Sequence, residues 1–483
     1  MLILLLIYWK LGVWPLGGKT LLEADAVHQY LPFLTELRRH LVESESLFYS
    51  FSGGLGYNFW STIAYYAASP LNLLTALIPE PNVCDFMSWI TVLKLGLAGG
   101  IMAWYLCRRD HGGVPTAATL GTLYALSNFF LSYKYNLMWL DSIAAAPLIL
   151  FGLEHMLHER RSGVYMAALF FALWCNYYIG YMLCIFACLY LAFLLFTETE
   201  RGERLPCLIR FALSSLLAGG MAAVLLLPAW LVLRVFSAAD YAARPGMKLY
   251  ASLVEVLRAH AFDAEAFHIS YERGAVQLYC GVLVLPLAAM YFLTPGIDKK
   301  RRLGMAALTG FLLLSFQFSP LNYAWHGFHM ESGLPNRFAF LYLRLLMLQA
   351  HAALCRLPEL GLRRFLVGMT AALLCTAVYA VYEASALHSF TLFVTLGLLY
   401  APILYALETL PGCRARVSLL LCALLIGEAA LHSRQELLRI GSGTRDFYIN
   451  YQRDAQALSD AAGKHGFSRG EIDNEAWCTF CQG

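Results

Sequence analysis

Charged side chains are scarce in this chain, and their scarcity excludes a soluble protein. Only 14% of the 483 residues are Asp, Glu, Lys or Arg, whereas 59% are hydrophobic. Soluble domains carry about 25% charged residues, so this composition cannot build a surface that faces water everywhere. The mean hydropathy is +0.58. The bilayer is therefore expected to cover much of the molecule, and the small net charge of +3 gives no reason to expect nucleic acid as a partner.

Nucleotide-binding and secretory signals are also missing. No Walker loop or dinucleotide fingerprint occurs between a strand and a helix, which argues against a nucleotide-sugar donor. The first apolar run, residues 1–17, has no basic segment before it and no small-residue cleavage site after it. It is therefore expected to be a first spanning helix, clipped at its start, rather than a cleaved signal peptide.

Long apolar segments fill the chain instead. A helix needs about 20 apolar residues to cross the hydrocarbon core. The candidate segments are residues 1–17, 86–107, 114–132, 142–157, 163–180, 182–197, 208–233, 275–294, 303–319, 338–355, 365–382, 388–409 and 417–432. We therefore predict an all-α fold, a polytopic transmembrane bundle of about thirteen helices over residues 1–432.

Lys and Arg are distributed unevenly between alternate loops. The basic loops hold Arg108, Arg109, Arg160, Arg161, Arg201, Arg204, Lys299, Lys300, Arg301, Arg302, Arg356, Arg363, Arg364, Arg414 and Arg416. The other short loops hold little beyond Lys134 and Arg337. Since short cytoplasmic loops are enriched in Lys and Arg, the N-terminus is predicted to be cytoplasmic. Segments 18–85, 234–274 and 320–337 are then outside.

Asparagine follows the same division. All ten asparagines fall in the predicted outer half: Asn58, Asn72, Asn82, Asn128, Asn136, Asn176, Asn322, Asn336, Asn450 and Asn474. An amide offers two donors and an acceptor, which suits hydroxyl-rich ligands. We favour a polar outer site, and the alternative is that the outer loops are simply longer.

The first outer segment, residues 18–85, is too long for a simple connector. Its apolar residues recur at helical spacing: Val27, Tyr30, Leu31, Leu34, Leu37 and Leu41. This pattern predicts an amphipathic helix along the membrane surface, with Asp25 at its start and Gln29 one turn further on the same face. Aromatic residues and asparagines follow, including Tyr57 and Asn58. They are typical of sugar recognition, and an interfacial aromatic belt is the alternative.

Six short strings occur in a particular order along residues 1–345. They are Asp25-x-x-x-Gln29-Tyr30-x-Pro32-Phe33, Gly54-Leu-Gly56-x-Asn58-Phe59, Tyr66-x-x-Ser69-Pro70, Asn136-x-x-Trp139-x-Asp141, Asn176-Tyr-Tyr178-Ile-Gly180-Tyr-Met182 and Asn336-Arg337-Phe338-x-Phe340. This ordered set resembles the YfhO-type bacterial membrane proteins. The resemblance implies a GT-C-like fold and a glycosyltransferase of the plasma membrane. It also implies a polyprenyl-phosphate-linked sugar as donor and a cell-envelope polymer, such as teichoic acid, as acceptor.

YfhO-like chains usually continue into a large outer C-terminal region. The resemblance therefore implies that residues 433–483 are the start of such a region, truncated in this chain.

Two carboxylates are candidates for catalysis. Inverting sugar transfer needs a base that takes the acceptor proton, and Asp25 matches the acidic position that GT-C-type enzymes have in their first outer loop. The alternative role for Asp25 is a helix N-cap. Asp141 is the second candidate, either to orient the acceptor or to hold a divalent cation, Mg²⁺ or Mn²⁺, together with Asp25. Asp141 can equally cap its helix, and without a tight Asp-x-Asp cluster the metal stays open.

Three cations are candidates for binding the donor phosphate: Arg337, Arg344 and Lys94. Charges inside a membrane are costly and are functional by default, although snorkelling and structural ion pairs are the alternatives. The remaining residues predicted to bind substrate are Gln29, Tyr30, Tyr57, Asn58, Asn136, Trp139, Asn176, Tyr178 and Asn336. Polar residues in loop 234–274 are further candidates for the acceptor groove.

Two other functions fit the composition: a transporter or lipid flippase, and a non-catalytic envelope assembly factor. Transporters usually carry internal repeats with matched broken helices. The long segment 18–85 has no counterpart in the second half of the chain, and the asparagines lie on one side. Sugar transfer is therefore the favoured prediction.

Overall fold

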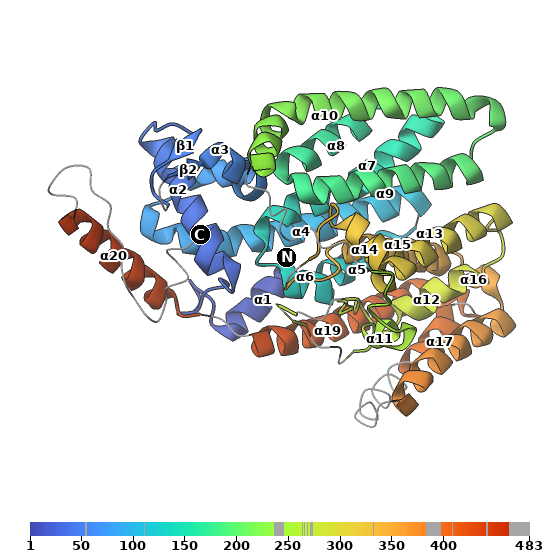
Figure 1. Cartoon of the computed structure of the whole chain (residues 1–483). Coiled ribbons are helices and arrows are strands. Elements are labelled where there is room, and N and C mark those ends of the chain that lie inside the picture. The colour runs from blue at the N-terminus through green and yellow to red at the C-terminus, as the bar shows by residue number, and fades with distance from the viewer. Residues whose placement is uncertain are drawn as a thin grey trace.

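The computed structural model describes residues 1–53, 56–110, 112–235, 246–262, 264, 266–267, 269–270, 274–331, 333–382, 398–407, 409–440 and 443–462. Helices dominate this part of the chain (Figure 1). Its one sheet is a hairpin of two short strands, β1 (Tyr49–Ser50) and β2 (Tyr57–Asn58), in antiparallel pairing. The predicted all-α fold is confirmed.

The helices follow one another in an antiparallel bundle. The main ones are α1 (Leu2–Leu11), α2 (Leu31–Val42), α3 (Phe59–Thr62), α4 (Val83–Asp110), α5 (Val114–Ala125), α6 (Asn128–Tyr133), α7 (Leu137–His158), α8 (Gly163–Cys175), α9 (Tyr177–Thr197), α10 (Arg204–Val235), α11 (Leu253–Arg258), α12 (Val284–Tyr291), α13 (Lys299–Gln317), α14 (Ser319–Trp325), α15 (Ala339–Cys355), α16 (Leu357–Leu360), α17 (Leu362–Tyr382), α19 (Arg414–Ile440) and α20 (Arg445–Ala462). Short π and 3₁₀ turns are η1 (Ala26–Tyr30), η2 (Ile63–Ala67), η3 (Pro70–Leu77), η4 (Glu80–Asn82), η5 (Arg201–Glu203) and η8 (Pro411–Cys413).

Five helical segments of the described part are long and apolar enough to cross a membrane. They are Glu80–Asp110, Leu137–His158, Tyr177–Thr197, Arg201–Val235 and Pro411–Arg439. Shorter apolar helices accompany them: Leu2–Leu11, Gly163–Cys175, Ala339–Cys355 and Leu398–Leu407. The predicted count of thirteen stays a prediction, since half of the span 388–409 lies outside the described residues.

Three predicted spans differ from the structure. Helix α1 has 10 residues, about 15 Å of rise, and Met1 packs beside Gly96 in the middle of α4. The predicted span 114–132 is divided between α5 and α6. The predicted span 275–294 is helical only from Val284. Gly281, just before this helix, has a φ of 109°, which a right-handed helix does not contain. Hydropathy alone does not register such backbone breaks.

The two ends of the bundle differ in chemistry. Arg109, Arg301, Arg356 and Arg414 line one cavity, so four of the predicted cytoplasmic loops meet at the same end, here called the arginine end. Helix α4 has 28 residues and a rise of about 42 Å, and it connects this end to residues 18–82. These residues form the opposite end, the first-loop end, where α2, α3, β1 and β2 lie together (Figure 1).

The predicted amphipathic helix of the first loop exists as η1 and α2. Its apolar residues Leu34 and Leu37 are buried, and α2 packs against α4 and η3. The polar residues Glu36 and His40 are buried as well: Ser50 from the hairpin donates a hydrogen bond to Glu36, and His40 lies 2.9 Å from it. The apolar side of this helix therefore packs against the protein itself, and its position along the membrane surface stays a prediction.

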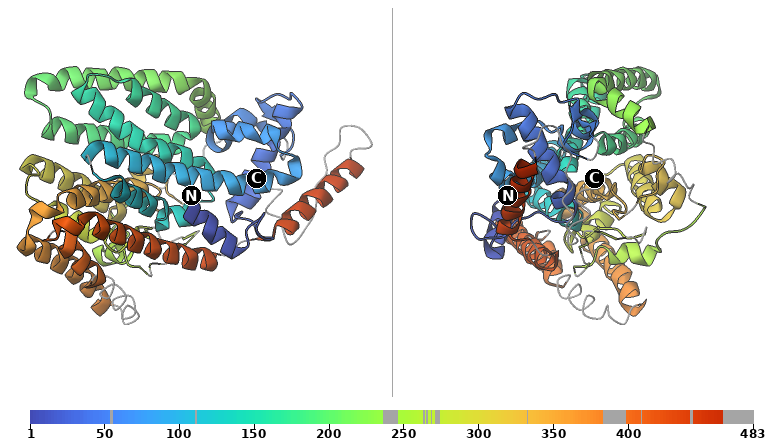
Figure 2. Two further views of the ribbon diagram at one scale, coloured as in Figure 1. Left: turned by 180° about the vertical axis from the view of Figure 1, so that it is seen from behind. Right: turned by 60° about the vertical axis from the view of Figure 1, so that its left-hand side comes forward.

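Burial distinguishes the inner helices from the outer ones. The most apolar window of α7 is 83% buried, whereas that of α10 is only 22% buried. Helix α10 lies on the outside of the bundle in both views of Figure 2, and its exposed leucines suit contact with lipid.

The C-terminal part lies at the first-loop end. Helix α19 runs through the predicted boundary at residue 432, and α20 projects from the bundle (Figure 1). Arg445 at the start of α20 forms an ion pair with Asp85 of α4 at 2.9 Å.

Candidate functional site

A cavity of about 300 Å³ opens at the first-loop end. The residues that line it are Asp25, Gln29, Tyr30, Tyr65, Tyr66, Asn136, Trp139, Ile269, Gly333, Leu334 and Arg337. Six of them were candidates from the sequence: Asp25, Gln29, Tyr30, Asn136, Trp139 and Arg337. They come from three distant parts of the chain, so the fold assembles this polar pocket from segments that are far apart in sequence.

The turn of π-helix η1 sets the position of Asp25. Asp25 occupies the N-cap position of η1, yet its side chain makes no capping hydrogen bond. The capping alternative is therefore not realised, and the carboxylate faces the cavity. Burial raises the pKa of Asp25 above its ordinary value, while the positive charges of His28 and Arg337 oppose this rise. A carboxyl group with a raised pKa is a better proton acceptor than an ordinary aspartate.

Hydrogen bonds between aromatic and amide side chains connect the walls of the cavity. Tyr30 donates its hydroxyl proton to Asn136 Oδ1 at 2.7 Å, which connects the first loop to the start of α7. Tyr66 donates to Gln29 Oε1 at 3.1 Å. These bonds hold flat aromatic faces beside amide groups, which is the combination that hydroxyl-rich ligands require.

Arg337 lies in the turn before α15 and is held by aromatic rings. Its guanidinium carbon is 5.4 Å from the Trp139 ring centre and 5.2 Å from that of Tyr178. Its Nε donates to the carbonyl oxygen of Leu334 at 3.0 Å. In the described part of the chain no carboxylate lies within ion-pair distance of this group, so cation–π contacts and a backbone oxygen support it instead.

The structure does not bring Asp141 and Lys94 to the cavity. Lys94 Nζ and Asp141 Oδ2 lie 2.6 Å apart, with 1% and 4% of their side chains exposed. Lys94 also donates to the carbonyl oxygen of Leu137 at 3.1 Å. This corrects the expectation that Asp141 acts beside Asp25 and that Lys94 binds phosphate: the two charges neutralise each other inside the bundle. In the described residues no group of three His, Cys, Asp or Glu side chains is arranged to hold a metal ion.

Replacing Lys94 by Met is expected to destabilise the protein by about 3–5 kcal/mol, because it leaves the Asp141 carboxylate buried without its cation. The double variant Lys94→Met/Asp141→Leu should recover most of this loss. The measurement is the midpoint of thermal unfolding in detergent, followed by size-exclusion chromatography. A single variant as stable as the unmodified protein would contradict the role of this ion pair.

Arg344 is also placed away from the cavity. It is completely buried, and its Nη2 donates to the Tyr124 hydroxyl at 2.9 Å and to the Ile143 carbonyl oxygen at 3.2 Å. The rings of Tyr124 and Phe340 pack on its guanidinium group. The expectation that Arg344 binds phosphate is corrected, because its partners lie within the helix packing.

Two predicted asparagines cap helices. Asn58 accepts from the Ser61 amide at the start of α3, and Asn176 accepts from the Ile179 amide at the start of α9, each at 2.9 Å. Asn176 also donates to the carbonyl oxygen of Tyr65 and so positions a residue of the cavity wall. Part of the outward bias of asparagine therefore reflects helix capping.

Asn336 and Tyr57 also lie away from the cavity lining. Asn336 donates to the carbonyl oxygen of Ala275 at 2.8 Å. Tyr57 belongs to β2, and its ring makes an edge contact with Phe59. Both residues hold local structure together rather than facing the cavity.

The sequence candidates did not include Tyr65, Tyr66, Ile269, Gly333 and Leu334, although all of them line the cavity. Tyr65 and Tyr66 stood in the aromatic string of the first loop, which was the available signal. The other three lie in the predicted outer segments 234–274 and 320–337, where nothing in the sequence distinguishes them.

Comparison with known proteins decides the family. The sequence pattern described as "Bacterial membrane protein YfhO" matches residues 1–475. The chain belongs to the YfhO family. The resemblance seen in the sequence is therefore confirmed, and with the apolar helices it makes this YfhO-family chain a multi-pass membrane protein.

One curated relative and one solved structure are similar to parts of the chain. "Uncharacterized protein YfhO" of Bacillus subtilis (strain 168) is 24% identical over 351 residues, which are 68% of this chain and 37% of the relative. The chain thus spans little more than a third of that relative's length. The cryo-EM structure of the arabinofuranosyltransferase AftD from Mycobacteria superposes with a TM-score of 0.43 at 16% identity, over 80% of this chain and 26% of AftD.

Proposed function

We propose that this YfhO-family chain is a GT-C-type membrane glycosyltransferase. It transfers a sugar from a polyprenyl-phosphate carrier to a cell-envelope polymer, such as teichoic acid, on the extracytoplasmic face. The observation that carries the proposal is that the Asp25 carboxylate and the Arg337 guanidinium line one cavity of about 300 Å³. A carboxylate can take a proton from an acceptor hydroxyl, and a guanidinium can bind a departing phosphate.

In the proposed reaction the acceptor hydroxyl oxygen attacks the anomeric carbon of the sugar. The bond from that carbon to the phosphate oxygen breaks, and polyprenyl phosphate leaves with the bonding electrons. Asp25 takes the hydroxyl proton, and Arg337 stabilises the negative charge that develops on the phosphate. No redox partner or further reactant is required.

The other cavity residues suit the recognition of a sugar. Tyr65 and Tyr66 offer partly exposed aromatic rings and Gln29 a partly exposed amide, while the buried Asn136 and Trp139 support the wall behind them. A volume of about 300 Å³ is at the lower end of ligand pockets, which fits one sugar with its phosphate and leaves the lipid outside. We assign Asp141 a positioning role, because its partner Lys94 holds the start of α7, where Asn136 and Trp139 lie.

The proposed orientation follows from charge. Cytoplasmic loops are enriched in Lys and Arg, so the arginine end is assigned to the cytoplasm and the first-loop end to the outside. In this orientation the cavity lies where a sugar carried on a lipid in the outer leaflet can reach it.

The test is expression of the chain in bacteria that lack their own YfhO-family gene. Mass spectrometry of the isolated envelope polymers should show a mass increment of one sugar unit that is absent without the chain. If the polymers are unchanged while the lipid-linked sugar accumulates in the outer leaflet, the chain is a transporter and the proposal is wrong.

A further inference from the structure

A second cavity, of about 720 Å³, lies at the arginine end. Four arginines from separate parts of the chain line it: Arg109 near the end of α4, Arg301 in α13, Arg356 after α15 and Arg414 at the start of α19. The proposed sugar transfer does not use this cavity, which lies at the opposite end of the bundle from Asp25.

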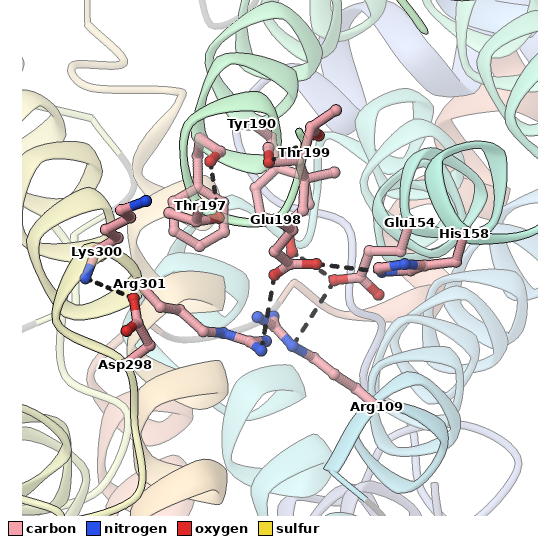
Figure 3. Close-up of polar contacts among 12 residues, drawn as sticks. Arg109, Glu154, His158, Tyr190, Thr197, Glu198, Thr199, Asp298, Lys300 and Arg301 are labelled. Atoms are coloured by element: carbon pink, nitrogen blue, oxygen red, sulfur yellow. Dashed lines mark hydrogen bonds and ion pairs between the residues drawn. The ribbon is translucent and has the colours of Figure 1, made fainter. Parts of the chain in front are cut away.

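Two of these arginines have carboxylate partners at long distance. Arg109 Nε lies 3.7 Å from Glu154 Oε1, and Arg301 Nη1 lies 3.6 Å from Glu198 Oε1. Both separations exceed a hydrogen bond, so the donors of these groups are not saturated by the carboxylates. Figure 3 shows Arg109 and Arg301 reaching toward one another from opposite sides.

The other two arginines have no carboxylate within 4 Å among the residues that the structure describes. The Nε of Arg414 donates to the carbonyl oxygen of Leu407 at 3.2 Å. Asp110 and Asp298 also line the cavity, and one oxygen of each has a partner elsewhere. Asp110 Oδ2 lies 2.8 Å from His351 Nδ1, and Asp298 accepts from the Lys300 amide at 2.7 Å. With four arginines against two aspartates, the residues that line the cavity carry an excess of positive charge.

The rest of the lining fits an amphiphilic anion. Helices α5, α13 and α19 all begin at this cavity, and the positive ends of their dipoles add to the arginine charge. Ala352 and Leu354, which are partly exposed, supply apolar surface beside the charged groups. A ligand with a phosphate group and a hydrocarbon part would satisfy both kinds of lining.

The distribution of basic residues alone does not explain this arrangement. This distribution accounts for arginines at one end of the bundle. Arg160 and Arg161 are also found there, with 67% and 78% of their side chains exposed. These two residues belong to the loop between α7 and α8 and do not line the cavity. The presence of four arginines from separate parts of the chain around one cavity needs a further reason.

We infer that this arginine-lined cavity binds the phosphate headgroup of an anionic phospholipid from the leaflet at the arginine end. Arginine forks bind phosphate oxygens in pairs, and basic pockets between membrane helices hold anionic headgroups. The shared chemistry is the phosphate group, so a soluble phosphate compound is the competing source.

The experiment measures lipid binding to the purified chain in neutral detergent by native mass spectrometry. Phosphatidylglycerol is titrated against phosphatidylcholine, with Arg356→Gln/Arg414→Gln as the test variant and Arg160→Gln/Arg161→Gln as the matched control. The test variant is expected to bind phosphatidylglycerol about 30-fold more weakly, and the control to stay within about twofold of the unmodified chain. Arg356→Lys/Arg414→Lys keeps both charges and should fall between them.

Two results would overturn the inference. One is an equal loss in the control, which would reduce the effect to general surface charge. The other is displacement of the lipid by inorganic phosphate that also binds alone, which would identify a soluble ligand. Should the glutamine variant fail to fold, the salt dependence of the unmodified chain decides: phosphatidylglycerol binding must weaken with salt while phosphatidylcholine binding does not.

Discussion

Replacement of Asp25 by Asn is expected to lower the rate of sugar transfer by about 10²–10⁴-fold, the usual contribution of a positioned proton acceptor. The amide has nearly the size of the carboxylate but cannot take a proton from the acceptor hydroxyl. Asp25 makes no capping bond, so the helix after it should remain intact. The measurement is the transfer rate from a lipid-linked sugar in membranes that contain equal amounts of folded variant and unmodified chain.

Glu80→Gln is the matched control for Asp25→Asn. It makes the same chemical change at the same end of the bundle, where Glu80 is 49% exposed and pairs with Arg38 at 3.6 Å. Its transfer rate should equal that of the unmodified chain. If Asp25→Asn transfers sugar at the normal rate, Asp25 is not the base.

The pH profile separates a catalytic Asp25 from a structural one. A base acts in its deprotonated form, so activity should be full above its pKa and fall as the pH drops through it. Burial raises the pKa of Asp25. The activity should therefore fall at a higher pH than the ordinary aspartate pKa of about 3.9. The residual activity of Asp25→Asn should lack the limb.

Replacement of Arg337 by Gln is expected to lower the turnover rate by about 10²–10³-fold, since it removes a donor aimed at the charge that develops on the leaving phosphate. Lysine should restore only part of the rate, because it lacks the planar fork that stacks on Trp139 and Tyr178. The measurement is the dependence of the transfer rate on donor concentration, which separates turnover from donor binding.

A second readout connects Arg337 to Asp25. The positive charge of Arg337 lowers the pKa of Asp25, so Arg337→Gln should move the acid limb of the pH profile to higher pH. Arg453→Gln, at a residue 70% exposed in α20, is the control and should change neither rate nor profile. A normal rate in Arg337→Gln would remove this residue from the proposed site.

Local patterns were sufficient for much of the fold. Helices such as α4, α9 and α10 were predictable because hydropathy and length are properties of a continuous segment. Asp25, Gln29 and Tyr30 could be grouped for a similar reason, since residues about one turn apart share a face whatever the rest of the chain does.

The errors came from a pairing between distant segments and from local helix caps. Lys94 was identified as an unusual charge within an apolar run and Asp141 as a carboxylate at the start of another, but their ion pair joins two helices 47 positions apart in sequence. Asn58 and Asn176 were identified as ligand-binding amides, whereas both cap helices. The partner in the ion pair depended on packing, whereas each asparagine caps the amide three residues further along the chain, a local contact that the sequence analysis did not consider.

Hydropathy, helix length and charge bias predicted a helical membrane protein with basic loops on alternate connections, and the six ordered strings indicated the YfhO family, because none of these features requires knowledge of distant contacts. Which polar groups meet is seen only in the folded chain. It joined Asp25 and Arg337 at one cavity, withdrew Asp141 and Arg344 into the helix packing, and collected four arginines around a second cavity. The physical reason is that a charge inside a bundle must find its partner in space, and the crossing of helices decides which partner is within reach.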